Sequence, residues 1–128
     1  ETAEIVAEAD GCRVKVIPEL RGISLGLWEG QLVADVRDRH GRIFAQWSRD
    51  PTSITPPEGE EMEKAFARAQ AAARTIRRKN RKGTAAVVAS ETVIALLVCH
   101  FTGRPPGRVF EVVKNLEPVE VVDEADVG

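Results

Sequence analysis

The chain has 128 residues, 43% of them hydrophobic and 30% charged, which is typical of one soluble globular domain over residues 1–128. Eighteen basic and twenty acidic residues give a net charge of −2, which argues against bulk electrostatic binding of nucleic acid or anionic lipid. The most apolar stretch, residues 85–101, contains Ser90, Glu91 and Thr92 and falls short of the roughly 20 apolar residues that a membrane span needs. We therefore expect no membrane partner and no nucleic-acid partner.

The two cysteines, Cys12 and Cys99, are too few for a disulfide framework. The two histidines lie 60 positions apart, at 40 and 100, so no cysteine and histidine cluster has the spacing of a metal site. We expect no metal, no cofactor and a reduced, cytoplasmic setting, with Cys99 buried as a small apolar residue.

The chain begins in a helical pattern, because residues 2–9 place Ile5 and Ala9 on one side of a helix. A helix that begins without a capping residue is typical of the tail of a longer one. We therefore expect further sequence upstream of Glu1.

Three different patterns follow. Residues 13–17 alternate polar and apolar side chains and predict a short strand. Residues 20–30 are rich in glycine and serine around Trp28 and predict a structured loop. Residues 31–47 repeat apolar side chains at helical spacing, with a weak point at Gly41.

A long helix is predicted after the proline-rich loop of residues 50–59. Glutamates at its start suit the positive end of the helix dipole, and Gly83 is the expected stop. The expected inner stripe consists of Met62, Ala65, Phe66, Ala69, Ala73 and Ile76.

The last third of the chain predicts a sheet. The continuous apolar run 85–89 is typical of a central parallel strand, and residues 91–101 predict an apolar helix. Residues 109–113 and 119–122 are further strand candidates. Strands that alternate with helices predict an α/β fold, a three-layer αβα sandwich around a mainly parallel sheet. Ligands of such sheets collect at the carboxyl ends of strands, which points to Ser90 and Glu91.

Several segments, taken in order, resemble the histidine phosphatase superfamily, whose fold is that of phosphoglycerate mutase. Residues 20–30 (LRGISLGLWEG) are similar to its "LRE-I-x-x-G-x-WEG" segment, and residues 86–94 (AVVASETVI) to its "LVVSHGGVI". The remaining matches are Trp47 to Pro51 with Pro57 to Glu60 for "W-x-x-DP … P-x-GES", Cys99 to Gly103 for "CHLLG", and Glu1 to Ala3 for the end of "RAxxTA".

The resemblance implies a specific chemistry. In that family a histidine in an Arg-His-Gly turn after the first strand becomes phosphorylated, arginines and a second histidine surround the phosphoryl group, and a carboxylic acid protonates the leaving oxygen. Here the first strand and helix of the family, with that turn, would precede Glu1. The acid position is Gly22 and the second-histidine position is Ser90.

Arg39-His40-Gly41 spells the nucleophile tripeptide, but it follows a charged, amphipathic segment and comes after the WEG segment. The family's tripeptide follows a buried strand and comes before WEG. We therefore interpret His40 as an exposed helix-end residue and the match as chance.

Other candidates have plainer alternatives. A residual anion site could be formed by Arg21, Ser90, Glu91 and Thr92, although Ser90 could equally be only a helix N-cap, and Arg21 could pair with Glu19 or Glu29. The basic residues Arg74 to Lys82 could bind a polyanion but also suit a helix C-terminus. A metal cluster could be suggested by the glutamates Glu58, Glu60, Glu61 and Glu63. The start of a helix is the simpler explanation, because acidic residues are favoured at the positive end of the helix dipole.

The resulting prediction is a degenerate domain of this family, with no catalytic residues in place, no phosphotransfer activity, and a structural or partner-binding role. The expected partner is a second copy or an intact homologue, and phosphate or a phosphomonoester would bind weakly at most. The alternative is a piece of an active phosphomonoesterase or phosphoglycerate mutase whose nucleophile lies upstream of residue 1. The sequence names no substrate.

Overall fold

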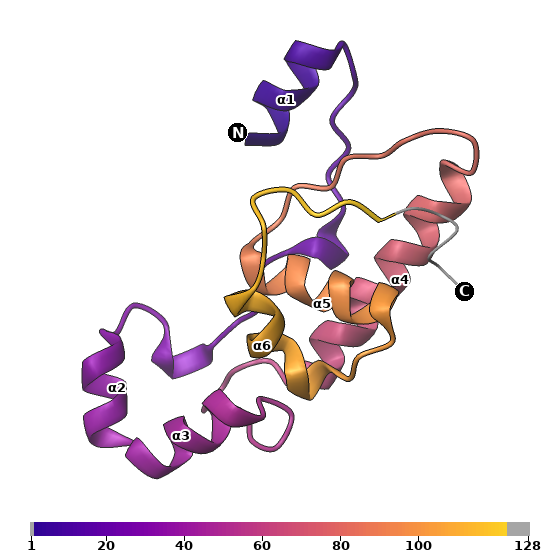
Figure 1. The fold of residues 1–128 in the computed structure, drawn as a ribbon. Helices are drawn as coiled ribbons and strands as arrows, with labels where there is room; N and C mark the ends of the chain where they lie inside the picture. Colours follow the sequence, from indigo (N-terminus) through magenta and orange to yellow (C-terminus); the bar gives the residue numbers. More distant parts are fainter. Residues whose placement is uncertain (1, 123–128) are drawn as a thin grey trace.

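The computed structural model describes residues 2–122, and within them it is built of helices and extended connections. Figure 1 shows α4, α5 and α6 packed together, α2 and α3 to one side of them, and α1 standing apart at the end of an extended segment. The helices are α1 (Thr2–Asp10), α2 (Val33–Arg39), α3 (Gly41–Arg49), α4 (Met62–Lys79), α5 (Glu91–Thr102) and α6 (Val109–Lys114), with 3-10 turns η1 (Pro18–Leu20), η2 (Gly26–Trp28) and η3 (Pro106–Arg108).

The helical predictions are confirmed. Residues 2–9 lie in α1, residues 91–101 in α5, and the weak point at Gly41 is a true break, because His40 ends α2 and precedes α3. The long helix α4 begins at Met62, so Glu60 and Glu61 precede it, and it ends at Lys79, before Gly83.

The core is the contact of α4 with α5 and α6. Ala65 and Ala69 of α4 are fully buried, as are Ala95 and Leu96 of α5. Alanines leave room for the two helix backbones to approach closely. Of the predicted inner stripe of α4, Met62, Ala65, Ala69 and Ala73 are buried, whereas Phe66 and Ile76 are half-buried. Cys99 is buried in the same cluster, as expected, and burial raises the pKa of its thiol.

The predicted αβα sandwich is wrong, because residues 2–122 contain no β-strand. Residues 13–17 and 85–89 are extended, but no backbone ladder joins them to another described segment, and a strand exists only through such a ladder. Residues 119–122 are also irregular, with Val119 and Val121 strongly exposed.

The strand predicted over residues 109–113 is instead the helix α6. Val109 and Val112 are three residues apart, so a helix buries both of them on one face against α5. Burial of this face outweighs the strand preference of valine, which depends strongly on context.

Candidate functional site

A cavity of about 230 Å³ opens where the segment after η1 meets the start of α5. Gly22 from the first segment and Ser90 and Thr92 from the second line it together. The remaining wall is apolar and consists of Ile23, Leu25, Trp47, Met62 and Phe110. Two positions that the resemblance assigned to the acid and the second histidine therefore share one cavity, although they are 68 positions apart.

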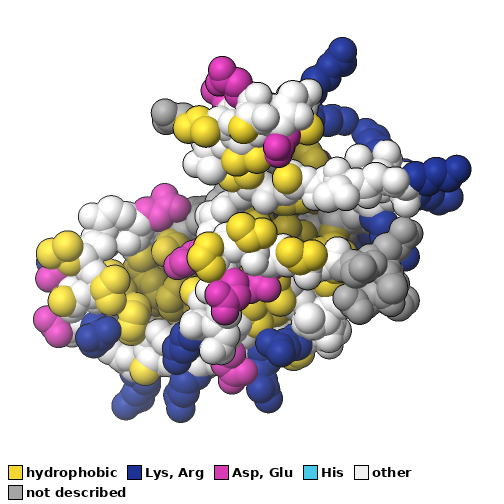
Figure 2. Space-filling view, turned by 45° about the horizontal axis from the view of Figure 1, so that its top comes forward, with side chains coloured by type: hydrophobic (Ala, Val, Ile, Leu, Met, Phe, Trp, Pro, Cys, Tyr) yellow, Lys and Arg dark blue, Asp and Glu magenta, His cyan; other side chains and the backbone are white. Residues whose placement is uncertain are grey.

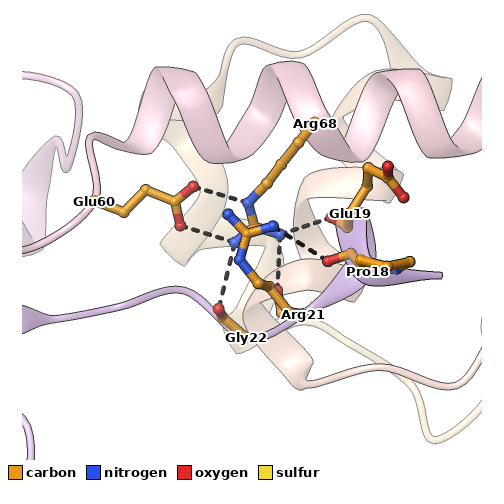
Figure 3. A network of polar contacts seen from close by, with 6 residues as sticks. All are labelled: Pro18, Glu19, Arg21, Gly22, Glu60 and Arg68. Atoms are coloured by element: carbon orange, nitrogen blue, oxygen red, sulfur yellow. Dashed lines mark hydrogen bonds and ion pairs between the residues drawn. The ribbon is translucent and has the colours of Figure 1, made fainter. Parts of the chain in front are cut away.

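The segment that carries Gly22 is held by Arg68 of α4. Figure 3 shows the Arg68 guanidinium between the Glu60 carboxylate and the backbone of residues 19–22. It donates to Glu60 Oε2 and Oε1, both at 2.8 Å. It also donates to the carbonyl oxygens of Glu19 (2.7 Å), Arg21 (2.8 Å) and Gly22 (3.3 Å). A planar guanidinium with five N–H donors suits this set of acceptors, so one side chain fixes the segment onto α4.

Glu60 completes this arrangement from the other side. Its backbone N–H donates to the Ser24 carbonyl at 2.9 Å, and the hydrogen bonds from Arg68 hold the pKa of its carboxyl below the ordinary value. The charge of nearby Arg21 acts in the same direction. Glu60 is therefore an ionised structural partner, and Glu61 forms an exposed ion pair with Lys64 at 3.8 Å.

A glycine sets the next part of the loop. Gly26 has φ +58°, and a Cβ there would lie 2.1 Å from the Pro57 carbonyl oxygen. Only glycine fits this close approach. The Leu27 N–H then donates to that carbonyl at 2.9 Å, which ties residues 25–27 to the proline-rich loop and fixes the wall residue Leu25.

Aromatic rings form the wall beside α3. Trp47 and Phe110 meet edge to face with centroids 4.8 Å apart, and Trp28 packs on Trp47 at 5.5 Å. Trp28 is only 5% exposed, so its buried ring anchors the structured loop that the sequence predicts over residues 20–30. Its indole N–H has no partner among the described residues.

Ser90 precedes α5, yet its hydroxyl makes no capping hydrogen bond to that helix. Its carbonyl accepts from the Ile94 N–H at 2.9 Å, as an ordinary first helical bond. Ser90 therefore occupies the N-cap position of α5, as the alternative expected, but without a side-chain capping bond, and it is also one of the residues that line the cavity.

The predicted anion-site residues are divided by the structure. Ser90, which is exposed, and half-buried Thr92 line the cavity, whereas Arg21 and Glu91 are not part of its lining. Arg21 donates to the Pro18 carbonyl at 3.2 Å rather than to Glu19 or Glu29. The lining as the structure describes it, over residues 2–122, contains no charged side chain.

The other candidates lie away from this cavity. The exposed His40 ring stacks on Trp28 at 6.4 Å, and Trp28 in turn contacts the wall residue Trp47. His40 is thus separated from the cavity by two rings.

The basic residues at the end of α4 also lie elsewhere. Lys15 lies close enough to Lys79 to lower the pKa of the Lys79 amine. Across residues 2–122, no three histidine, cysteine or acidic side chains are placed to hold a metal ion.

Arg68, Trp47, Met62 and Phe110 were not identified as site residues from the sequence. Arg68 contacts backbone carbonyls that lie 46 to 49 residues earlier in the chain, and local sequence spacing gives no signal for contacts at such a separation.

The described part of the chain also holds no helix with the length and apolarity needed to span a membrane.

The fold and the segments around this cavity define a class of protein. Residues 1–123 match the histidine phosphatase superfamily (branch 1), and the chain belongs to that family, as the sequence resemblance indicated.

The chain is 27% identical to YhfR of Bacillus stearothermophilus, with a TM-score of 0.77 over 85% of this chain and 54% of that one. A mycobacterial glucosyl-3-phosphoglycerate phosphatase shares the fold, at 23% identity and a TM-score of 0.74 over 86% of this chain and 55% of that one. A bifunctional protein of Mycobacterium tuberculosis is 32% identical over 102 residues, which are 80% of this chain and 25% of that protein. The chain thus spans about half the length of these structures and a quarter of that protein.

Proposed function

We propose that this chain is a histidine-phosphatase-family domain that performs no phosphotransfer by itself and acts as a structural or partner-binding domain. The observation that carries the proposal is the cavity lining. Gly22 and Ser90, which the sequence resemblance assigns to the family's acid and second-histidine positions, both line it, and the described lining has neither a charged nor a histidine side chain.

The proposal follows from what the reaction requires. A phosphohistidine mechanism needs a histidine nucleophile, cations around the developing charge and an acid for the leaving oxygen. A serine hydroxyl donates a hydrogen bond but brings no charge, and glycine has no side chain to donate a proton. Arg68, the arginine held beside this segment, is engaged by Glu60 and backbone carbonyls.

The test is turnover of p-nitrophenyl phosphate by the 128-residue chain. We expect the rate to equal that of the buffer blank, with and without vanadate. Turnover that vanadate inhibits would contradict the proposal. The His40→Ala variant is then informative, because loss of that turnover would identify His40 as the nucleophile, whereas unchanged turnover would point to another group.

A second candidate is a piece of an active phosphomonoesterase or mutase. The observation that favours it is coverage, since the chain spans 54% and 55% of the two solved relatives. The missing groups would then come from elsewhere in a longer protein. Intact mass of the protein from its natural source distinguishes the candidates: a mass well above 14.0 kDa favours the second, and turnover by that longer protein would support it.

The partner-binding role has its own test. Val16, Val119 and Val121 are 82%, 76% and 86% exposed on extended segments, and Figure 2 shows hydrophobic side chains across the middle of one face. Extended, unpaired backbone is open to pairing with another chain. We expect self-association that grows with concentration in sizing experiments, and a monomer across a wide range would contradict association with a second copy.

A further inference from the structure

The end of α4 and the segment before η1 carry a cluster of basic side chains. Seven exposed residues make up this basic cluster, and none of them forms an ion pair within residues 2–122: Arg13, Lys15, Arg74, Arg78, Lys79, Arg81 and Lys82. Figure 2 shows a group of Lys and Arg side chains at its upper right. The cluster lies at the opposite end of α4 from the cavity residue Met62, about 25 Å away along the helix. We propose that the basic cluster binds the phosphate backbone of a nucleic-acid duplex without reading its sequence.

The cluster joins two segments that are distant in the sequence. Lys15 lies beside Lys79, and this contact lowers the pKa of the Lys79 amine. The segment of Lys15 is extended, so its side chains alternate between two faces and Arg13 lies on the same side as Lys15. On α4, Arg74 and Arg78 are four positions apart and share one face of the helix. Cations from both segments therefore contribute to one surface.

The helix dipole accounts for only part of the cluster. Cations are favoured in the last turn of a helix, which suits Arg78 and Lys79. The effect is confined to that turn, so it does not account for Arg81 and Lys82 beyond the helix or for Lys15 from another segment. Like charges that lie together repel one another, and a bound polyanion relieves that repulsion.

The charges of the chain are unevenly distributed. The net charge of −2, which argued against bulk binding of nucleic acid, is an average over all 128 residues. Since seven of the eighteen basic residues lie in the basic cluster, the rest of the chain is acidic overall. A protein with such a distribution can bind a polyanion through one face only.

The side chains around the cations favour a duplex over a single strand or a lipid surface. Residues 13–15 and 74–82 contain no aromatic residue, so the cluster has no ring on which an unpaired base could stack. Val14 and Val16 are exposed, but in an extended segment they lie on the face opposite to Lys15. These valines are therefore turned away from the cation, unlike apolar residues that insert into a lipid surface beside basic ones.

The cluster is suited to phosphates rather than to bases. Its cations can make charge-assisted hydrogen bonds to phosphate oxygens. Asn80, the amide within the cluster, is engaged, because its Nδ2 donates to the Ile76 carbonyl at 2.8 Å. Phosphate contacts position a protein on a duplex and carry no sequence information. We therefore expect binding that depends on salt and not on base sequence.

The experiment is fluorescence anisotropy of a labelled DNA duplex of about 20 base pairs, titrated with the 128-residue chain at about 50 to 200 mM salt. We expect saturable binding with a Kd on the order of 10 μM at the lowest salt. Affinity should fall about a hundredfold over this range, as expected for about four phosphate contacts. Unlabelled single-stranded DNA, polyglutamate and phosphatidylserine vesicles should each compete less well than unlabelled duplex.

Two variants test the two segments separately. Arg78→Gln, Lys79→Gln and Arg81→Gln together should weaken duplex binding by about tenfold or more and reduce the salt slope by about 3, one for each lost contact. Lys15→Gln lies outside the helix and leaves α4 unchanged. It should weaken binding by a few fold and reduce the salt slope by about 1.

The matched control removes three exposed arginines of α2 and α3, Arg39→Gln, Arg42→Gln and Arg49→Gln, which changes the net charge by the same amount. This control should bind as the wild type does. The proposal is overturned if the duplex gives no saturable change, or if single-stranded DNA, polyglutamate or the vesicles compete as well as the duplex. It is also overturned if both variants of the cluster bind as the wild type does with unchanged circular dichroism, or if the control loses as much affinity as they do.

Discussion

Gly22 and Ser90 both line the cavity, and neither has a side chain that ionises near neutral pH. The sequence resemblance assigned these two residues to the family's acid and second-histidine positions. Only the fold shows that they line the same cavity. Arg68 is the residue that positions Gly22, and its contacts give a direct prediction about stability.

Arg68→Met should destabilise the chain far more than Lys64→Met. The side chains of Arg68 and Glu60 are only 11% and 17% exposed, whereas Lys64 and Glu61 are 75% and 58% exposed. Breaking a buried pair leaves a buried charge unpaired and costs about 3 kcal/mol, but an exposed pair contributes less than about 1 kcal/mol. Urea unfolding measures both. Equal losses for the two variants would show that the Arg68 contacts do not stabilise the loop.

His100 gives a pH dependence. Burial, and then the charges of Arg74 and Arg77, lower the pKa of His100, whose Nδ1 lies 3.2 Å from Gln70 Nε2. The folded state therefore disfavours the protonated ring. This stability is fully present above the unfolded pKa of about 6.5 and is lost as pH falls below it through the folded pKa.

Urea unfolding at about pH 7.5 and about pH 5.5 measures this loss, and both values stay above the window of the carboxylates. We expect His100→Gln to reduce the difference between the two conditions. The matched control is His40→Gln on the exposed histidine, which should leave the difference in place. A wild-type stability that is flat over this interval would disprove the role of His100.

At the scale of elements, the contact of α4 with α5 depends on small side chains. Ala69 is fully buried there, and Ala67, two residues earlier in α4, is exposed. Ala69→Leu should cost about 1–3 kcal/mol, because the added atoms have no space between the helices. Ala67→Leu should stay within about 0.5 kcal/mol of wild type. Thermal unfolding by circular dichroism checks both, and a neutral Ala69→Leu would mean that the helices can move apart without cost.

The helices also differ in how well sequence patterns predict them. The helices α4 and α5 could be predicted because each carries a long periodic stripe that matches what it buries. The segment that became α6 has three valines in five residues, which fits a strand by composition. Its helical state follows from the burial of Val109 and Val112 against α5, and the pattern of residues 109–113 alone does not contain that contact.

At the scale of the whole molecule, the extended segments should be the least protected parts of the backbone. Within residues 2–122, the N–H groups of residues 13–16 and 84–89 donate no hydrogen bond, whereas α4 and α5 are continuous helices around the core. Hydrogen exchange should therefore be fast in these segments and slow in α4 and α5. Slow exchange at residues 84–89 would indicate that a ladder forms there in solution, as pairing with another chain would produce.

The sequence by itself determined the family, the α4 and α5 helices and the buried Cys99, because each depends on a residue type or on spacing within one segment. Only the tertiary structure decided that no described segment forms a strand, that Arg68 holds the Gly22 segment, and that Gly22, Ser90, Trp47 and Phe110 share one cavity. These outcomes depend on partners tens of residues away. A backbone ladder, the contacts of the Arg68 guanidinium and the wall of the cavity each require two separate segments to lie side by side. The local pattern of one segment does not show which other segment will lie beside it.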